Sequence, residues 1–99
     1  MAQRVKRWRL LWTEPARDDL REIFRFILQD NPVAARNVIR EIRQKVERLT
    51  QFPLSGRDVP ELPDTAFREV IIGNYRVIYR VVRNTVEILT VVHGRRKVG

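Results

Sequence analysis

The side chains best suited to chemistry in this sequence are arginines placed at strand spacing in its last third. Residues 75–81 read YRVIYRV, and because side chains alternate along a strand, Arg76 and Arg80 share one face with Ile78. We expect the tyrosines and valines to pack on the core and both arginines to stand on the open face. Arg68 of the preceding strand joins them there unless a bulge at Gly73 shifts the register. Arginine forks bind phosphate and carboxylate oxygens bidentately. The pattern therefore predicts a surface for an acidic or phosphate-rich partner, although solubility alone also explains exposed arginines.

A second group of cations lies beyond the last predicted strand, in the run His93-Gly94-Arg95-Arg96-Lys97. Three consecutive cations at the end of a sheet suit a phosphodiester or an acidic peptide. A solvated tail explains the same run, and His93 taken alone fits a hydrogen-bonded structural role. The two groups of cations together predict binding more strongly than any single member does.

The net charge of +8 is segregated along the chain. Residues 1–13 carry four basic residues and no acid, residues 14–63 balance nine basic against nine acidic residues, and residues 64–99 hold seven basic against three acidic residues. The surplus therefore falls on the segments predicted to form the sheet. Such a segregated basic surface is the usual footprint of polyanion binding or of an acidic protein partner.

Several kinds of site are absent from the sequence. The chain has no cysteine and one histidine, so a disulfide framework and a thiolate zinc site are excluded, and neither a glycine-rich phosphate loop nor an HExxH motif occurs. We therefore expect no cofactor and no metal, and any chemistry would fall to Arg, Lys, Tyr, Glu or His93. No stretch approaches the roughly 20 apolar residues of a membrane span. These features predict a cytoplasmic protein without a membrane partner.

The elements that carry these residues follow from apolar spacing and helix caps. Residues 8–13 are short and rich in strand-forming residues, which predicts a first strand. Thr13 caps a helix predicted over residues 14–29, and Asn31 caps a second helix over residues 32–51. The short connection between these helices makes them an antiparallel hairpin.

The remainder of the chain reads as a loop followed by strands. Residues 52–65 are rich in proline and predict an ordered loop, and Gly73-Asn74 is a good hairpin turn. We therefore expect one α+β domain over residues 1–99, in which an N-terminal strand and a two-helix hairpin precede a three-stranded antiparallel meander, with the helices on one face of the sheet. The later elements are predicted as strands over 66–72, 75–82 and 86–92, followed by a basic tail over 93–99.

Motifs distributed over these elements resemble the RelE/ParE superfamily, the toxin halves of prokaryotic toxin–antitoxin pairs. The resemblance covers residues 8–97 and implies the same order of elements, a RelE/ParE-like fold. Its motifs are Trp12-Thr13 to Asp19-Leu20, Asn31-Pro32-Val33-Ala34-Ala35, Phe52-Pro53 with Gly56-Arg57, Arg68-Glu69-Val70, the strand from Gly73 to Arg80, and the ending Val91-Val92-His93-Gly94-Arg95-Arg96.

RelE-like members of this superfamily are ribosome-dependent ribonucleases that cut messenger RNA without a metal. The resemblance places Arg76 on their phosphate-stabilising arginine and Arg68 on the first of two strand lysines. It places Arg96 on the basic residue after the last strand. His93 is a candidate substitute for the missing base. The second lysine is replaced by Val70, and a tyrosine found beyond the last strand has no counterpart. These departures, together with the poor basicity of arginine, argue against an efficient ribonuclease.

ParE-like members instead inhibit DNA gyrase by protein–protein contact. The long helical hairpin and the His-Gly-Arg-Arg ending are closer to this branch, so the resemblance implies a gyrase-directed toxin. A RelE-like messenger RNA endoribonuclease is the alternative, followed by a toxin that has lost its activity. Outside the superfamily, a plain basic RNA-binding module is the competing interpretation.

The resemblance also implies a cognate antitoxin that threads an acidic, partly disordered segment across the toxin to form a hetero-oligomer. A segment that folds on binding gains both apolar contact and charge neutralisation. The residues expected to bind the antitoxin or the target are Arg76, Arg80, Arg95, Arg96, Lys97, Phe26 and Leu28.

Overall fold

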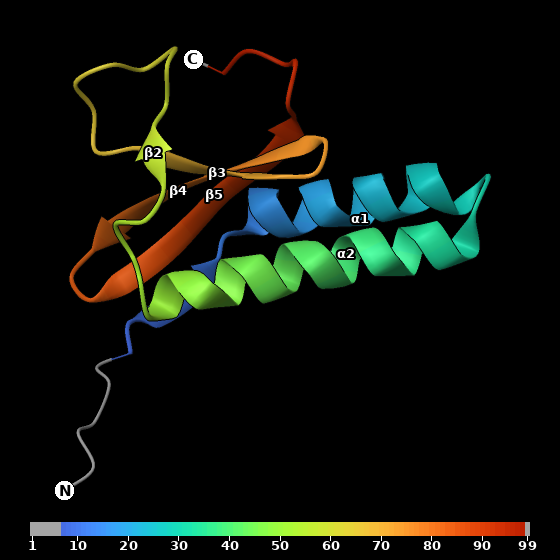
Figure 1. The fold of residues 1–99 in the computed structure, drawn as a ribbon, viewed down its shortest axis with the longest axis horizontal. Helices are drawn as coiled ribbons and strands as arrows, with labels where there is room; N and C mark the ends of the chain where they lie inside the picture. Colours follow the sequence, from blue (N-terminus) through green and yellow to red (C-terminus); the bar gives the residue numbers. More distant parts are fainter. Residues whose placement is uncertain (1–6, 99) are drawn as a thin grey trace, which may run out of the picture.

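A computed structural model describes residues 7–98, which form one mixed sheet with two helices on one of its faces (Figure 1). The expected α+β class and order of elements are confirmed. The basic residues Arg4 and Lys6 and the terminal Gly99 lie outside the described part of the chain. The elements are β1 (Arg9–Trp12), α1 (Glu14–Leu28), α2 (Pro32–Glu47), a short 3₁₀ helix η1 (Arg48–Thr50), β2 (Arg57–Asp58), β3 (Arg68–Ile72), β4 (Tyr75–Val82) and β5 (Thr85–His93).

The sheet has the strand order β1-β5-β4-β3-β2, in which β3, β4 and β5 form the expected antiparallel meander. β1 pairs in parallel with β5 at one edge, although the helices and three other strands lie between them in the chain. β2 lies within the segment expected to be a loop and pairs with β3 at the other edge. The connection between α1 and α2 projects beyond the ends of the strands (Figure 1).

α1 and α2 each begin at a side-chain cap and have a proline in the first turn. The Thr13 hydroxyl accepts the amide of Ala16 and donates to the carbonyl of Ile88 at 2.7 Å, so the same side chain starts α1 and fixes it to β5. Asn31 starts α2 by accepting the amide of Ala34 at 3.0 Å. Neither helix among residues 7–98 has both the length and the apolar character needed to cross a membrane.

The core lies between the helices and one face of the sheet. The β4 side chains Tyr75, Val77, Tyr79 and Val81 face the helices as expected, with Val77 and Tyr79 fully buried. Their partners are the apolar stripes of both helices and of β5, namely Ala16, Leu20, Ile42, Val46, Val86, Ile88 and Val91.

A β-bulge interrupts the pairing of β4 with β5 and is held by an aspartate of α1. Ile78 pairs with Thr90 and Tyr79 with Ile88, so Leu89 has no partner on β4. The carboxylate of Asp19 accepts the Thr90 hydroxyl at 2.5 Å and the Val91 amide at 2.9 Å. Asp19 therefore binds the distorted strand to α1.

Replacing Asp19 should destabilise the fold far more than replacing its neighbour. Asp19→Ala leaves the Val91 amide and the Thr90 hydroxyl without their acceptor, which should lower the free energy of unfolding by about 1–3 kcal/mol. Asp18 is exposed and pairs with Arg21 on the helix surface, so Asp18→Ala should cost under about 0.5 kcal/mol. Urea denaturation of both variants measures the difference, and equal losses would contradict a structural role for Asp19.

Candidate functional site

Arg76, the central arginine of the sequence analysis, is buried. Its exposed fraction is 5%, so the expectation that it stands on the open face of the sheet is wrong. It does lie on the face away from the helices, but the chain between β2 and β3 and the C-terminal tail cover it there. Strand alternation reports which face a residue occupies and says nothing about whether a loop covers that face.

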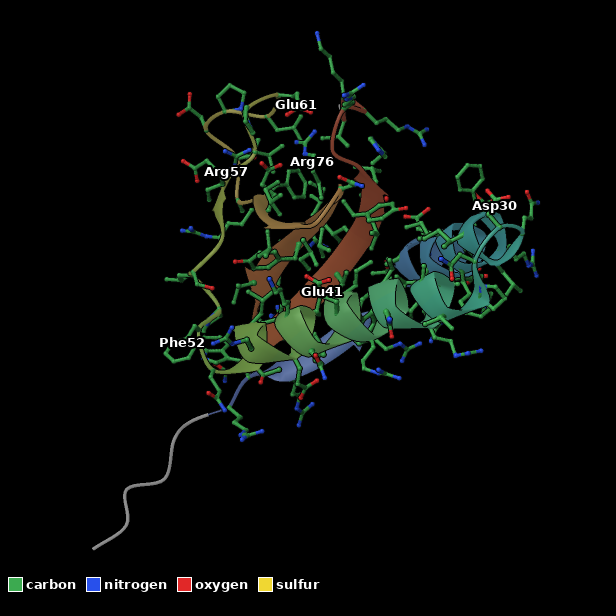
Figure 2. The ribbon with its side chains drawn as sticks, turned by 45° about the vertical axis from the view of Figure 1, so that its right-hand side comes forward. Asp30, Glu41, Phe52, Arg57, Glu61 and Arg76 are labelled. Carbon is green, nitrogen blue, oxygen red and sulfur yellow. The ribbon has the colours of Figure 1, made fainter. Side chains whose placement is uncertain are left out.

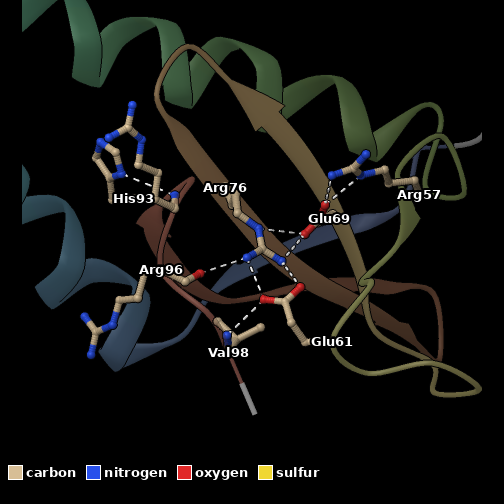
Figure 3. Close-up of polar contacts among 8 residues, drawn as sticks. Arg57, Glu61, Glu69, Arg76, His93, Arg96 and Val98 are labelled. Carbon is tan, nitrogen blue, oxygen red and sulfur yellow. Dashed lines mark hydrogen bonds and ion pairs between the residues drawn. The ribbon is translucent and has the colours of Figure 1, made fainter.

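All five N–H groups of Arg76 have acceptors (Figure 3). Nε and Nη2 donate to Glu69 Oε1 at 2.9 and 2.6 Å. Nη1 and Nη2 donate to the two oxygens of Glu61 at 2.7 and 2.8 Å. Nη1 also donates to the carbonyl of Arg96 at 2.8 Å. The guanidinium therefore has no donor left for a ligand.

Glu69 extends this contact into a four-residue cluster, which we call the ionic cluster: Arg57, Glu61, Glu69 and Arg76. The Glu69 side chain is fully buried and its second oxygen accepts Arg57 Nε at 2.6 Å. Two glutamates and two arginines cancel in charge, as burial requires. Figure 2 shows Arg57, Glu61 and Arg76 at one end of the sheet, far from Asp30 at the tip of the helical hairpin.

Contacts within the ionic cluster shift the pKa values of Glu61 and Arg76. The hydrogen bond from Arg76, followed by that from the Val98 amide, lowers the pKa of Glu61 from its ordinary value of 4.5 to about 2. The carboxylates in turn raise the pKa of Arg76. Both side chains are therefore charged throughout the neutral range.

Arg68 does not join Arg76. It pairs with Tyr79 across β3 and β4 and so lies on the opposite face of the sheet, which makes that expectation wrong. Its guanidinium donates to the carbonyls of Leu54 and Gly56. The Tyr79 hydroxyl closes the same loop by accepting the Gly56 amide at 2.9 Å, and a Cβ on Gly56 would lie 2.5 Å from that oxygen. Arg68 therefore fixes the loop that contains Leu54 and Gly56.

The remaining predicted cations are at the surface. Arg80 is exposed and pairs with Glu87 at 2.6 Å. Arg95, Arg96 and Lys97 are exposed, and their side chains form no ion pair within residues 7–98. His93 is exposed and meets Tyr75 edge-on. Of the four residues proposed for catalysis, only Arg76 and Arg96 come together, through the backbone carbonyl of Arg96.

The sequence analysis missed an apolar groove of about 580 Å³ between β1 and the helices. Four arginines line it, Arg17, Arg21 and Arg25 at four-residue spacing on α1 and Arg43 on α2. Phe26 and Leu28 are exposed, as the binding prediction requires, but lie outside the groove lining. The spacing of the α1 arginines was visible in the sequence, but the groove itself depends on where β1 lies. Its other lining residues are Leu10, Leu11, Trp12, Leu20, Phe24 and Ile39.

β1 forms one wall of this groove and is an edge strand. The amides of Arg9 and Thr13 bond the carbonyls of Asn84 and Ile88, so those of Leu10 and Trp12 point to the outer edge. Leu11 is 47% exposed. A free strand edge beside an apolar groove is a site at which an extended segment can dock.

Among the described residues, no group of three metal-ligating side chains is found.

The sequence matches the family described as the ParE toxin of type II toxin–antitoxin systems over residues 10–98. The protein Y4kP of Sinorhizobium fredii is 37% identical over 95 residues, which cover 94% of this chain and 95% of Y4kP. Toxin ParE3 of Caulobacter vibrioides is 31% identical over 88 residues, which cover 88% of this chain and 87% of ParE3.

Two solved structures have a similar fold. The chromosomal ParDE toxin–antitoxin system from P. aeruginosa gives a TM-score of 0.77 at 22% identity, covering 89% of this chain and 97% of that one. The toxin–antitoxin complex RelBE2 from Mycobacterium tuberculosis gives 0.63 at 22% identity, covering 93% of this chain and 97% of that one. At this identity the likeness establishes the shared fold.

Removal of Arg76 should destabilise the protein strongly. Arg76→Ala leaves the fully buried Glu69 carboxylate with one partner in place of two, which should lower the free energy of unfolding by about 3–5 kcal/mol. Arg80→Ala, four residues along the same strand, breaks an exposed pair and should cost at most about 1 kcal/mol. Thermal and urea unfolding measure both variants. A small loss for Arg76→Ala would show that Arg76 is not a structural residue.

The hydrogen bond from the Val98 amide to the Glu61 carboxylate should weaken only at very low pH. Because the pKa of Glu61 is lowered to about 2, its contribution to stability is complete above pH 4.5 and is lost as the pH falls through about 2. The Val98 amide donates to Glu61, so its proton chemical shift should titrate with a midpoint of about 2. A midpoint at the ordinary value of 4.5 would contradict the contact between Glu61, Arg76 and Val98.

Proposed function

This chain belongs to the ParE toxin family of type II toxin–antitoxin systems, and we propose that it acts by binding another protein, DNA gyrase, and not by cutting RNA. A cognate antitoxin neutralises it in a hetero-oligomer. The premise for both statements is the family match over residues 10–98.

The proposal rests on the observation that every N–H group of Arg76 is already hydrogen-bonded. A metal-independent ribonuclease needs cations at the position where phosphorane charge develops, together with a base and an acid. The resemblance assigned the phosphate contact to Arg76, whose five donors are all engaged by Glu61, Glu69 and the Arg96 carbonyl. Arg68 faces the other side of the sheet. The surface is thus better suited to binding than to phosphodiester chemistry.

An acidic amphipathic segment of the antitoxin suits the groove between β1 and the helices. The groove offers an apolar floor and four arginines, of which only Arg21 is ion-paired within residues 7–98. The outer edge of β1 adds backbone donors and acceptors for a strand. The exposed Arg80, Phe26 and Leu28 remain in the proposed antitoxin surface, whereas the buried Arg76 leaves it.

Expression in bacteria distinguishes the two targets. We expect supercoiling-dependent DNA cleavage by stalled gyrase and a DNA-damage response, with messenger RNA intact over the same interval. Purified protein should inhibit gyrase supercoiling in the absence of ribosomes. Rapid codon-linked cleavage of transcripts, with gyrase unaffected, would overturn the proposal in favour of the RelE-like alternative.

Charge reversal inside the groove should weaken the antitoxin complex. Arg43→Glu sets an acid against an acidic segment, so the dissociation constant should rise about tenfold, which corresponds to about 1.4 kcal/mol. Arg40→Glu makes the same change on an exposed position of α2 outside the groove lining and should shift the constant by less than about twofold. Titration calorimetry with the cognate antitoxin measures both. Equal losses in the two variants would show that net charge, and not the groove, governs binding.

A further inference from the structure

We propose that Glu61 is a positioning residue that fixes the C-terminal segment 94–98, so that Arg95, Arg96 and Lys97 form a rigid cationic surface for an acidic patch on the target protein. The inference deepens the proposed function and rests on it. It gives Glu61 a role in target binding that it performs through the backbone of the tail, without touching the target itself.

Hydrogen bonds hold the backbone of the tail at Gly94, Arg96 and Val98. The Gly94 amide donates to the Asn74 carbonyl at 2.7 Å, and the Arg96 amide donates to the His93 carbonyl at 2.9 Å. The Arg96 carbonyl accepts Arg76 Nη1 at 2.8 Å, and the Val98 amide donates to Glu61 Oε2 at 3.0 Å. Two of these four contacts run through the ionic cluster.

The cationic side chains of the tail are exposed, and that of Arg96 points away from the ionic cluster. Figure 3 shows the side chains of His93 and Arg96 extending away from the ionic cluster, on the opposite side from Arg57. Arg95, Arg96 and Lys97 are all exposed and carry no ion pair within residues 7–98. A frayed tail would spread these charges over many positions, whereas a held tail keeps them together. The tail then loses less conformational entropy when a partner binds.

Glu61 can be removed without leaving an unpaired charge in the core. Its side chain is 20% exposed, whereas that of Glu69 is fully buried. Without Glu61, Arg76 still pairs with Glu69 at 2.6 Å, so the buried charge stays neutralised. The tail, however, loses the acceptor of the Val98 amide, and Arg76 Nη1, which donates to the Arg96 carbonyl, loses its bond to Glu61. A substitution of Glu61 should therefore disorder the tail and leave the buried Arg76–Glu69 ion pair in place.

The size of the cationic surface favours protein carboxylates over a nucleic-acid backbone. A protein that makes about 6–10 phosphate contacts on duplex DNA needs cations spread along the helix. Three neighbouring cations on one short segment match a compact acidic patch instead. The occupant we assign is therefore an acidic surface of the target enzyme.

Hydrogen exchange and gyrase inhibition, measured on the same full-length variants, test the inference. In Glu61→Ala, the Val98 amide should exchange at least about tenfold faster than in the original protein, while the amides of the β4–β5 core keep their rates. In Glu61→Gln, which keeps one carbonyl acceptor, the increase should be smaller. The concentration needed for half-inhibition of gyrase should rise about tenfold. Glu41→Ala, which removes an acid of the exposed pair with Lys45 on α2, is the charge-matched control and should change neither quantity (Figure 2).

A double-mutant comparison shows whether Glu61 acts through the tail. When Arg95, Arg96 and Lys97 are all replaced by alanine, adding Glu61→Ala should change gyrase inhibition by less than about twofold. An undiminished effect of Glu61→Ala in that background, or unchanged Val98 exchange in both Glu61 variants, would overturn the inference. Binding of a 30-base-pair DNA duplex in the absence of gyrase, lost in the triple-alanine variant, would overturn the assignment to an acidic protein surface. If the original protein fails to inhibit gyrase, the proposed function fails, while Val98 exchange still decides whether Glu61 orders the tail.

Discussion

The buried carboxylate of Glu69 is the constraint on which the outer face of the sheet depends. An ionised carboxylate without solvent needs fixed cations and a full set of hydrogen bonds. Arg57 of β2 and Arg76 of β4 supply both, so Glu69 joins three strands. Arg76 has further donors to satisfy, and these recruit Glu61 and the Arg96 carbonyl. The edge strand, the loop before β3 and the C-terminal tail are thus all ordered around one charge.

This arrangement divides the arginines into two classes with different uses. Arg57, Arg68 and Arg76 are occupied by carboxylates or carbonyls and hold the structure together. Exposed arginines line the groove beside β1 and lie on the tail, and others, such as Arg40 and Arg80, lie elsewhere on the surface. A toxin of the ParE family built in this way offers two separate cationic surfaces, one suited to a wrapped antitoxin segment and one to a target. Electrostatic complementarity at such surfaces governs partner choice and the rate of association.

Most of the fold could be predicted from local signals, and the parts that could not depend on long-range placement. The caps at Thr13 and Asn31 and the apolar periodicity predicted the helices, and alternation predicted that Val77 and Tyr79 face them. The two-residue turn at Gly73-Asn74 also sets Ile72 opposite Tyr75, which puts Glu69, and not Arg68, on the face of Arg76. This register could therefore be predicted from the turn alone. The bulge at Leu89, the parallel pairing of β1 and the loop over Arg76 follow from tertiary packing and leave no local trace.

Nuclear magnetic resonance of the Arg76 guanidinium tests the central claim most directly, namely that this arginine is committed to the fold. With every N–H bonded to Glu61, Glu69 or the Arg96 carbonyl, its Nη protons should appear as separate, slowly exchanging signals. These signals should stay unchanged when a short single-stranded RNA is added. Averaged, rapidly exchanging Nη signals, or signals that shift with RNA, would contradict this claim and return Arg76 to the role of a phosphate ligand.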